Sequence, residues 1–206
     1  MTDRSPTSTD FFDVVTRQRA CREFSPEPVG DDDIAAVLTA ATHAPSAENK
    51  QPWEFVVVRN DATRAAIAEL TKRGWEAVGR EFSRGRLEPK MFAEVDRAQS
   101  EGYVSAPVMI AVCADTERGL EQTVPSSIFP AVQNLLLAAT ARGLGSALTT
   151  IAASFQAELR ELLDLPPHVV PVAVVPLGHP ARALGRPRRD TFESHTHVEH
   201  FGSPWT

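Results

Sequence analysis

The chain has little cysteine and no long apolar run, and both absences limit what it can be. Only two of its 206 residues are cysteines, Cys21 and Cys113, and they form no Cys-x-x-Cys motif. Two lone cysteines predict a reducing compartment rather than a disulfide-stabilised secreted domain. No segment offers the ~20 continuous apolar residues of a membrane span, and residues 1–10 lack the apolar stretch of a signal peptide. We therefore expect a cytoplasmic protein without a membrane partner.

A basic excess and the common catalytic motifs are also absent. The formal net charge of −6 disfavours a general nucleic-acid binder. The sequence has no Gly-x-Ser-x-Gly, His-Glu-x-x-His or P-loop motif. His195, His197 and His200 lie in a terminal segment without an acidic or cysteine partner at clear ligand spacing, so we predict no metal site.

What the chain does have is enough apolar sequence for one folded domain. Hydrophobic residues make up 42% of the chain and charged residues 23%, which allows a buried core. Apolar spacing predicts helices that begin near residues 10, 31, 63, 126 and 154, and short strands at 55–58, 107–114 and 169–177. Long helices between separated strands indicate an α+β or α/β domain. Residues 1–8 are expected to be a flexible tail.

Three local expectations follow from individual residues. Ser154 is expected to cap the last of these helices. Pro171 and Pro176 place the third strand at a strand end or a sheet edge, because proline cannot donate to a ladder. The segment 75–103 is charged with scattered aromatic residues, and its elements cannot be delimited by periodicity.

A basic segment follows the first predicted helix. Residues 17–24 run Arg-Gln-Arg-Ala-Cys-Arg-Glu-Phe, with three arginines within six positions. Grouped arginines can hold a phosphate through charge-assisted, often bidentate hydrogen bonds. The commoner alternative for such a segment, taken alone, is a solvated basic face.

A second polar segment joins the helix predicted from residue 31 to the strand at 55–58. Residues 45–53 run Pro-Ser-Ala-Glu-Asn-Lys-Gln-Pro-Trp, with prolines near both ends. Side-chain amides and backbone groups in such a loop can bind a small polar ligand. The simpler alternative is a helix stop followed by a core tryptophan.

Together the two segments resemble the signatures of the nitroreductase family, which are flavin (FMN) enzymes that use NAD(P)H. The first is similar to Arg-Arg-Ser-x-Arg-x-Phe and the second to Pro-Ser-x-x-Asn-x-Gln-Pro-Trp. The resemblance implies that Arg19 and Arg22 contact the flavin phosphate and the pyrimidine edge of the ring. It also implies that Asn49 hydrogen-bonds the ring and that Ser46 lies near the cofactor, often from the other subunit.

The first signature is matched with departures. Gln18 stands where the family usually has its first arginine, and Ala20 replaces the serine, so two usual phosphate ligands are missing. Cys21 is interpreted as either a small core residue or a neighbour of the flavin.

Two further segments extend the resemblance. The block from Gln133 through Gly-Leu-Gly-Ser at 143–146 is similar to a family helix that lies along the dimer interface. In the family, the turn after it places backbone N–H groups near the flavin ring, and Thr149 and Thr150 occupy that turn here. Arg188 and Arg189 match a basic pair that closes over the flavin phosphate. A core helix with a glycine stop and a basic surface tail are the respective alternatives.

The resemblance implies an α+β fold with a central, mostly antiparallel sheet flanked by helices, in an intertwined homodimer. Residues 9–206 would form one FMN-binding domain. The segment 75–103 would be a variable insertion that shapes the pocket. Its candidate substrate contacts are four aromatic residues, for which core packing is an equal alternative: Trp75, Phe82, Phe92 and Tyr103.

The implied activity is a ping-pong oxidoreductase reaction. NAD(P)H would deliver hydride to flavin N5, and a nitroaromatic, a quinone or a similar acceptor would then take the electrons. Because the cofactor carries this chemistry, no general acid or base is assigned. The alternatives are another flavin reaction, such as flavin fragmentation or reductive dehalogenation, a non-enzymatic FMN-binding protein, and an interaction domain without flavin.

Overall fold

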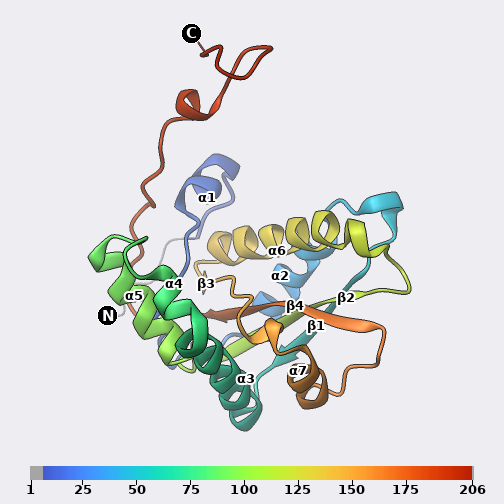
Figure 1. Cartoon of the computed structure of the whole chain (residues 1–206). Coiled ribbons are helices and arrows are strands. Elements are labelled where there is room, and N and C mark those ends of the chain that lie inside the picture. The colour runs from blue at the N-terminus through green and yellow to red at the C-terminus, as the bar shows by residue number, and fades with distance from the viewer. Residues whose placement is uncertain (1–6, 206) are drawn as a thin grey trace.

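The computed structural model describes residues 7–205, in which four antiparallel strands form one sheet between layers of helices (Figure 1). The strands pair in the order β1-β2-β4-β3. Every residue of β2 is buried, so helices cover both faces of the sheet. This confirms the expected α+β fold with an antiparallel sheet. The strand bounds are β1 Trp53–Val58, β2 Val108–Asp115, β3 Gly145–Ser146 and β4 Val169–Gly178.

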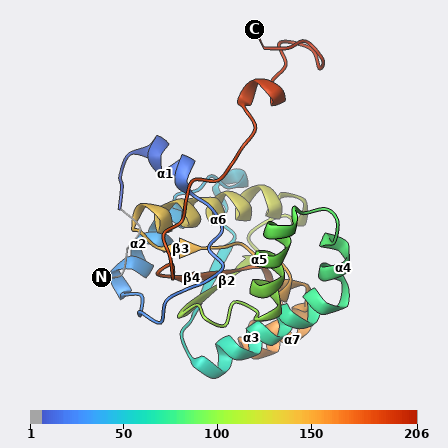
Figure 2. The ribbon, with the colours of Figure 1, turned by 90° about the vertical axis from the view of Figure 1, so that its left-hand side faces the viewer.

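Alternate residues of β2 pack against two different helix layers. Ile110 belongs to the core under α2 and α6, whereas Met109 packs into the core under α3, α5 and α7, as the two-residue period of a strand requires. Figure 2 shows the two layers on opposite sides of the sheet. The helix bounds are α1 Phe11–Arg17, α2 Asp31–Thr42, α3 Asp61–Gly74, α5 Pro89–Ser100, α6 Val124–Ala141 and α7 Gln156–Leu162.

Helix α6 is the central helix of one layer. Its buried side faces α2 and the sheet, with Ile128 and Leu135 fully enclosed. The stretch Glu121–Ala141 is long and apolar enough by composition to cross a membrane. In this fold it instead packs as a core helix, and Gly143, at φ 75°, ends it.

The segment that periodicity could not delimit forms a helical arm, defined here as residues 75–100. It consists of a π-helical turn, η2 (Trp75–Gly79), followed by α4 (Arg80–Ser83) and α5. Trp75 anchors the arm, because its Nε1 donates to Asp96 Oδ1 at 2.7 Å and Arg80 Nε donates to the same oxygen at 2.7 Å. The four-residue α4 and the π-turn leave no regular period for sequence analysis to detect.

The C-terminal tail, defined here as residues 181–205, leaves the body beside α1 and extends away from it (Figure 1). Arg186 fastens its start by pairing with Asp13 at 2.8 Å and donating to Thr16 Oγ1. Its far end folds on itself, with the rings of Phe192 and Trp205 5.9 Å apart.

Two local predictions are wrong. Ser154 does not cap α7; Phe155 holds the cap position, and no side chain bonds there. Strand β4 lies inside the sheet rather than at its edge. Its prolines are tolerated because Pro171 sits at a register shift opposite Cys113, and because β3 pairs with only two residues of β4.

Most residues of the predicted tail 1–8 lie outside the described part of the chain. Of those described, Ser8 donates its backbone N–H to Ala141 O at 3.0 Å, at the end of α6.

Candidate functional site

The basic segment lies at the C-terminal end of α6. After α1 the chain becomes extended and forms a parallel bridge from Ala20 to Ser146, in which Cys21 N donates to Ser146 O at 2.8 Å. Arg19 Nη1 donates to Gly185 O at 3.2 Å, so the start of the tail lies beside this segment. We call residues 19–22 together with 146–150 the arginine end of α6.

The arginine end also has an open backbone edge. Ala147 and Thr149 donate their N–H groups to Pro176 O and Val174 O in β4, at 3.3 and 3.0 Å. Because N–H directions alternate along an extended chain, those of Leu148 and Thr150 point away from β4. Among residues 7–205 they have no protein acceptor. The N–H group of Thr149 is thus used in the pairing with β4. The N–H groups left for a ligand are those of Leu148 and Thr150.

The polar loop 45–53 lies at the opposite end of α6. Ser127, near the N-terminus of α6, accepts from Ala47 N at 3.1 Å, and Ser46 Oγ accepts from Gln51 N at 3.0 Å. Asn49 Oδ1 accepts from Gln51 Nε2 at 3.1 Å. We call this loop the amide end. Sequence analysis missed the supporting role of Ser127, because no pattern links it to a loop 80 positions away.

The amide end carries unusual backbone strain. Glu48, Asn49 and Gln51 have positive φ angles of 53°, 56° and 49°. Left-handed backbone at non-glycine residues costs of the order of 1 kcal/mol each and is concentrated at functional loops. Asn49 is exposed, so the side-chain amide that this strained backbone carries is accessible at the surface.

The two halves of the predicted site do not meet within one protomer. Sixteen residues separate Ser127 from Gly143 along α6, which is about 24 Å at 1.5 Å per residue. Figure 1 shows the loop and the arginine end at opposite ends of this helix. Arg19 and Arg22 therefore cannot share a ligand of flavin-ring size with Ser46 and Asn49 of the same protomer.

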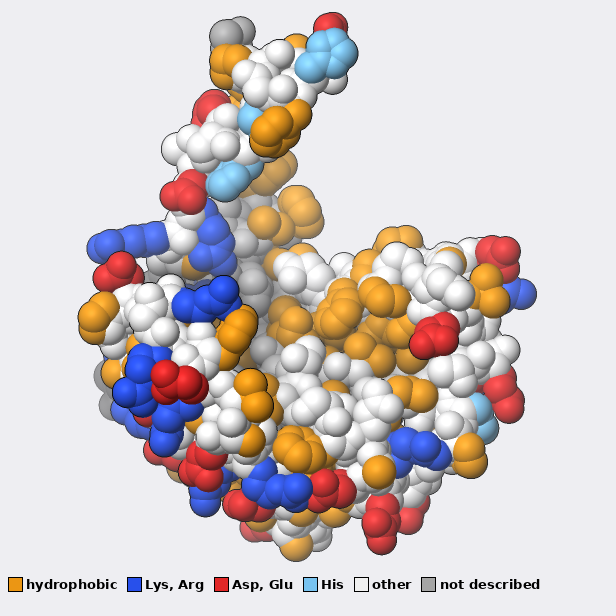
Figure 3. Space-filling view, in the orientation of Figure 1, with side chains coloured by type: hydrophobic (Ala, Val, Ile, Leu, Met, Phe, Trp, Pro, Cys, Tyr) orange, Lys and Arg blue, Asp and Glu red, His pale blue; other side chains and the backbone are white. Residues whose placement is uncertain are grey.

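The surface of α6 between the two ends is partly apolar. Gln133 is exposed there, and Phe129, one turn before it, keeps 39% of its surface exposed. Figure 3 shows apolar side chains gathered on this side of the molecule, facing the hollow beside the tail. Gln133 is thus accessible on an exposed, partly apolar face of α6.

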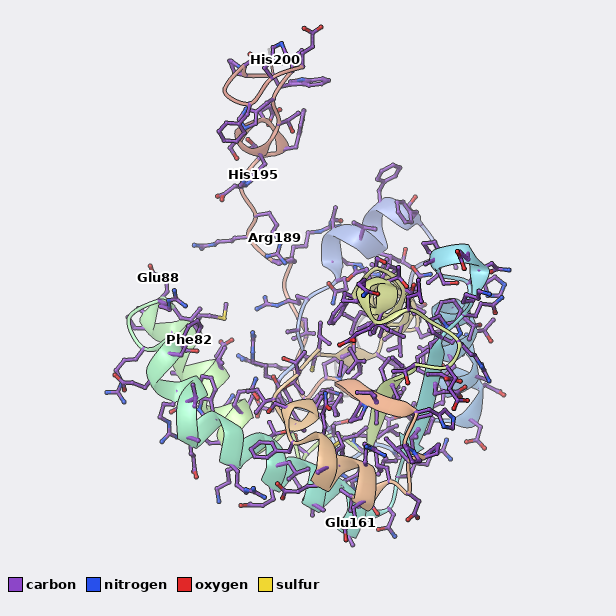
Figure 4. All side chains as sticks on the ribbon, turned by 45° about the vertical axis from the view of Figure 1, so that its right-hand side comes forward. Phe82, Glu88, Glu161, Arg189, His195 and His200 are labelled. Carbon is purple, nitrogen blue, oxygen red and sulfur yellow. The ribbon has the colours of Figure 1, made fainter. Side chains whose placement is uncertain are left out.

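The predicted C-terminal pair projects from the tail. Arg188 and Arg189 are exposed, and Arg189 Nη1 donates only to the neighbouring Arg188 O, at 2.8 Å. In the described part of the chain neither arginine pairs with a carboxylate. Figure 4 shows Arg189 on the tail beside α1.

Two of the four predicted substrate contacts are core residues instead. Trp75 and Tyr103 are 3% and 4% exposed, because the arm closes over both rings. Phe82 lies at the free end of the arm (Figure 4), 65% exposed, with the Arg86 guanidinium 4.1 Å from its ring centroid. Phe92 is partly buried. Only these last two remain candidate pocket residues.

Cys21 is a buried core residue, which agrees with the first of its two interpretations. It has no exposed surface, its Sγ donates to Glu23 O at 3.3 Å, and a Cβ on Gly145 would lie 2.6 Å from this sulfur. Burial raises the pKa of its thiol to about 11, so it stays protonated at neutral pH. The same cause raises the pKa of Cys113 to about 12. Neither thiol is a candidate nucleophile.

The hydrogen-bond donors of the arginine end suit a ligand that joins an anionic group to a ring with electronegative atoms. Arg19 and Arg22 supply cationic donors, and Leu148 and Thr150 supply uncommitted backbone N–H groups on the adjacent edge. The amide end adds neutral donors and acceptors. A phosphorylated, polar-edged ring such as FMN fits this donor set, provided that two protomers combine their ends.

Comparison with known proteins points to the same family that the two sequence signatures resemble. Residues 15–179 match the model of the nitroreductase family. Over 197 residues the chain is 32% identical to a provisionally named NADH dehydrogenase/NAD(P)H nitroreductase of Methanothermobacter thermautotrophicus, covering 93% of this chain and 87% of that protein. It is 33% identical over 151 residues to the 5,6-dimethylbenzimidazole synthase of Rhodospirillum rubrum, covering 68% and 69%.

Solved structures share the fold. A provisionally named nitroreductase of Desulfovibrio desulfuricans, solved in complex with FMN, superposes with a TM-score of 0.70 at 25% identity. The superposition covers 95% of this chain and 99% of that chain. The similarity therefore extends over nearly the whole length of both chains.

Proposed function

The chain belongs to the nitroreductase family, and from that premise we propose that it is an FMN-dependent oxidoreductase. It passes electrons from NAD(P)H to a small organic acceptor, such as a nitroaromatic or a quinone. The observation that carries this proposal is the pairing of a cationic end and an amide end on one helix, α6. Each end holds residues that match a flavin-binding signature.

Individual residues have separate roles in this proposal. Arg19, Arg22 and the tail pair Arg188 and Arg189 hold the phosphate and the pyrimidine edge through charge-assisted hydrogen bonds. The free N–H groups of the segment 148–150 face electronegative atoms of the ring and stabilise negative charge there. Bound FMN supplies the capacity to accept and return a hydride. The protein contributes position, electrostatics and exclusion of water.

The proposal requires a homodimer in which each site combines the arginine end of one protomer with the amide end of the other. This requirement is supported by the separation of the two ends, about 24 Å along α6, which leaves each protomer alone with half of the donor set at each end. The exposed apolar surface around Phe129 gives a second copy a place to pack, since such patches commonly mark interfaces. The exposed tail, with Arg188 and Arg189, then reaches toward the partner. We place this dimer in the cytoplasm.

A second reaction on the same scaffold has a specific observation in its favour. The chain is as similar to a 5,6-dimethylbenzimidazole synthase as to a nitroreductase, although over a shorter length. Flavin fragmentation is therefore the main alternative function, and reductive dehalogenation is a further alternative. The departures at Gln18 and Ala20 favour a third candidate, a protein that binds FMN weakly without turnover.

The absorbance spectrum of the purified protein tests these candidates. We expect flavin bands that bleach on anaerobic addition of NADH or NADPH and return with a nitroaromatic or a quinone. Flavin bands unaffected by either nicotinamide would contradict the reductase and favour one of the other flavin functions. No flavin after reconstitution with FMN would contradict all three.

A further inference from the structure

The strained amide end is attached to the other elements of the fold at two points. Ala47 N donates to Ser127 Oγ at 3.1 Å, and Asp115 N donates to Pro52 O at 2.7 Å. Within residues 7–205, no other hydrogen bond joins residues 46–52 to a different element. The remaining hydrogen bonds of the loop run between its own members, so they move with it.

The first attachment depends on one buried hydroxyl. Ser127 lies in the first turn of α6 and is only 1% exposed. Because the hydroxyl belongs to a core helix, it holds Ala47 at a fixed place relative to α6. Replacing the hydroxyl with a methyl group would leave Ala47 N without its acceptor, and an unmade hydrogen bond at a part-buried donor is costly.

The second attachment is a rigid turn at the end of β2. Asp115 is buried, and its Oδ1 accepts from Glu117 N at 2.9 Å and from Arg118 N at 3.3 Å. The turn then packs on the loop, because a Cβ on Gly119 would lie 2.9 Å from Pro52 Cβ. Residue 119 therefore has no room for a side chain unless Pro52 shifts.

Both attachments belong to one short segment, residues 115–127, which joins β2 to α6. We call it the anchor segment. The three residues with positive φ, Glu48, Asn49 and Gln51, all lie between Ala47 and Pro52. Left-handed backbone at non-glycine residues persists only where the surrounding structure fixes it. The anchor segment thus supplies the constraint that keeps Asn49 in its strained conformation.

We propose that Ser127 is a positioning residue that holds Asn49 in the conformation that meets the flavin, with the turn at Asp115 as the second anchor. Ser127 touches neither cofactor nor acceptor, since it acts through Ala47 and the strained loop. This inference rests on the proposed function, because Asn49 is the group through which Ser127 acts.

A double-mutant cycle on FMN affinity tests this role. Apoprotein variants are titrated with FMN, and the dissociation constant is read from flavin fluorescence. We expect Ser127→Ala to raise it ~3-fold, since part of the cost of a lost neutral hydrogen bond reaches Asn49 as lost preorganisation. In an Asn49→Gly background Ser127→Ala should have no further effect, because the group that it positions is gone.

Two further variants sharpen this test. Gly119→Ala disturbs the second anchor by crowding Pro52 and removes no hydrogen bond; it should weaken FMN binding through the same dependence on Asn49. Ser126→Ala is the matched control, because this neighbouring serine is exposed and its hydroxyl donates to Thr123 O at 2.9 Å, away from the loop. It should leave FMN affinity unchanged.

Amide hydrogen exchange of the apoprotein gives a measurement that needs no flavin. The peptide that contains residues 47–52 should exchange faster in Ser127→Ala than in Ser126→Ala, because local opening of the loop becomes easier. Equal exchange in the two variants would overturn the anchoring role.

The outcomes separate this inference from the proposed function. An unchanged dissociation constant in Ser127→Ala, or equal fold-changes in both backgrounds, would overturn the positioning role and leave the flavin assignment intact. Failure of the unsubstituted protein to bind FMN would overturn the proposed function and this inference together. If Ser127→Ala does not fold, the same cycle with Gly119→Ala decides.

Discussion

The two ends of α6 differ in what each can hold alone. The arginine end combines fixed positive charge with free N–H groups on unstrained, extended backbone. The amide end is a strained loop whose candidate ligand groups, the side chains of Ser46 and Asn49, are neutral. A charged ligand can bind the first without the second, because charge-assisted hydrogen bonds are about twice as strong as neutral ones. We infer that the arginine end supplies most of the affinity for FMN and that the amide end mainly orients the bound FMN.

The largest expected effect is at the arginine end. Arg22→Ala should raise the dissociation constant for FMN by ~10- to 100-fold, because a charged hydrogen bond contributes about 1.5–3 kcal/mol. Arg59→Ala is the control, since Arg59 is exposed and pairs with Asp31 outside the site. FMN affinity equal in the two variants would remove Arg22 from the site.

A smaller effect is expected at the amide end. Asn49→Gly should weaken FMN binding by ~5-fold, the effect of one neutral hydrogen bond. Glycine removes the side chain while tolerating the positive φ, so backbone strain is not added. Lys50→Ala, on the same loop at φ −73°, is the control. A larger loss of FMN affinity in Asn49→Gly than in Arg22→Ala would reverse the ranking of the two ends.

The smallest effect on FMN is expected in the arm. Phe82→Ala should leave FMN affinity unchanged but alter kcat/KM for bulky against small acceptors by a few-fold, since burying part of an aromatic ring contributes about 1 kcal/mol. A panel of nitroaromatics and quinones measures this change. Unaltered ratios across the panel would show that the free end of the arm does not form the pocket.

The sequence predicted those parts of the fold and site in which neighbouring residues carry the signal. The helix predicted to begin near residue 31 and the strand predicted at 107–114 follow from local apolar spacing. The structure confirms both, as α2 and β2. The basic segment and the polar loop were each recognisable as continuous motifs. The family assignment, which the comparisons confirm, rested on them.

The remaining features depend on contacts between distant residues. Trp75 and Tyr103 were equally compatible with a pocket and with a core, and only the closure of the arm buries them. The placement of β4 inside the sheet depends on a strand of two residues, β3, which has no detectable period. The separation of the two half-sites depends on the length of α6 and on which end each loop meets.

Mixing two defective protomers tests the shared site most directly. Arg22→Ala and Asn49→Gly subunits carrying different tags are co-expressed, and the mixed dimer is isolated and titrated with FMN. A site built from both protomers predicts one site of wild-type affinity per mixed dimer, because one site receives both native ends and the other receives both substitutions. If each site lay within one protomer, no site of wild-type affinity would appear, and the proposed arrangement would be contradicted.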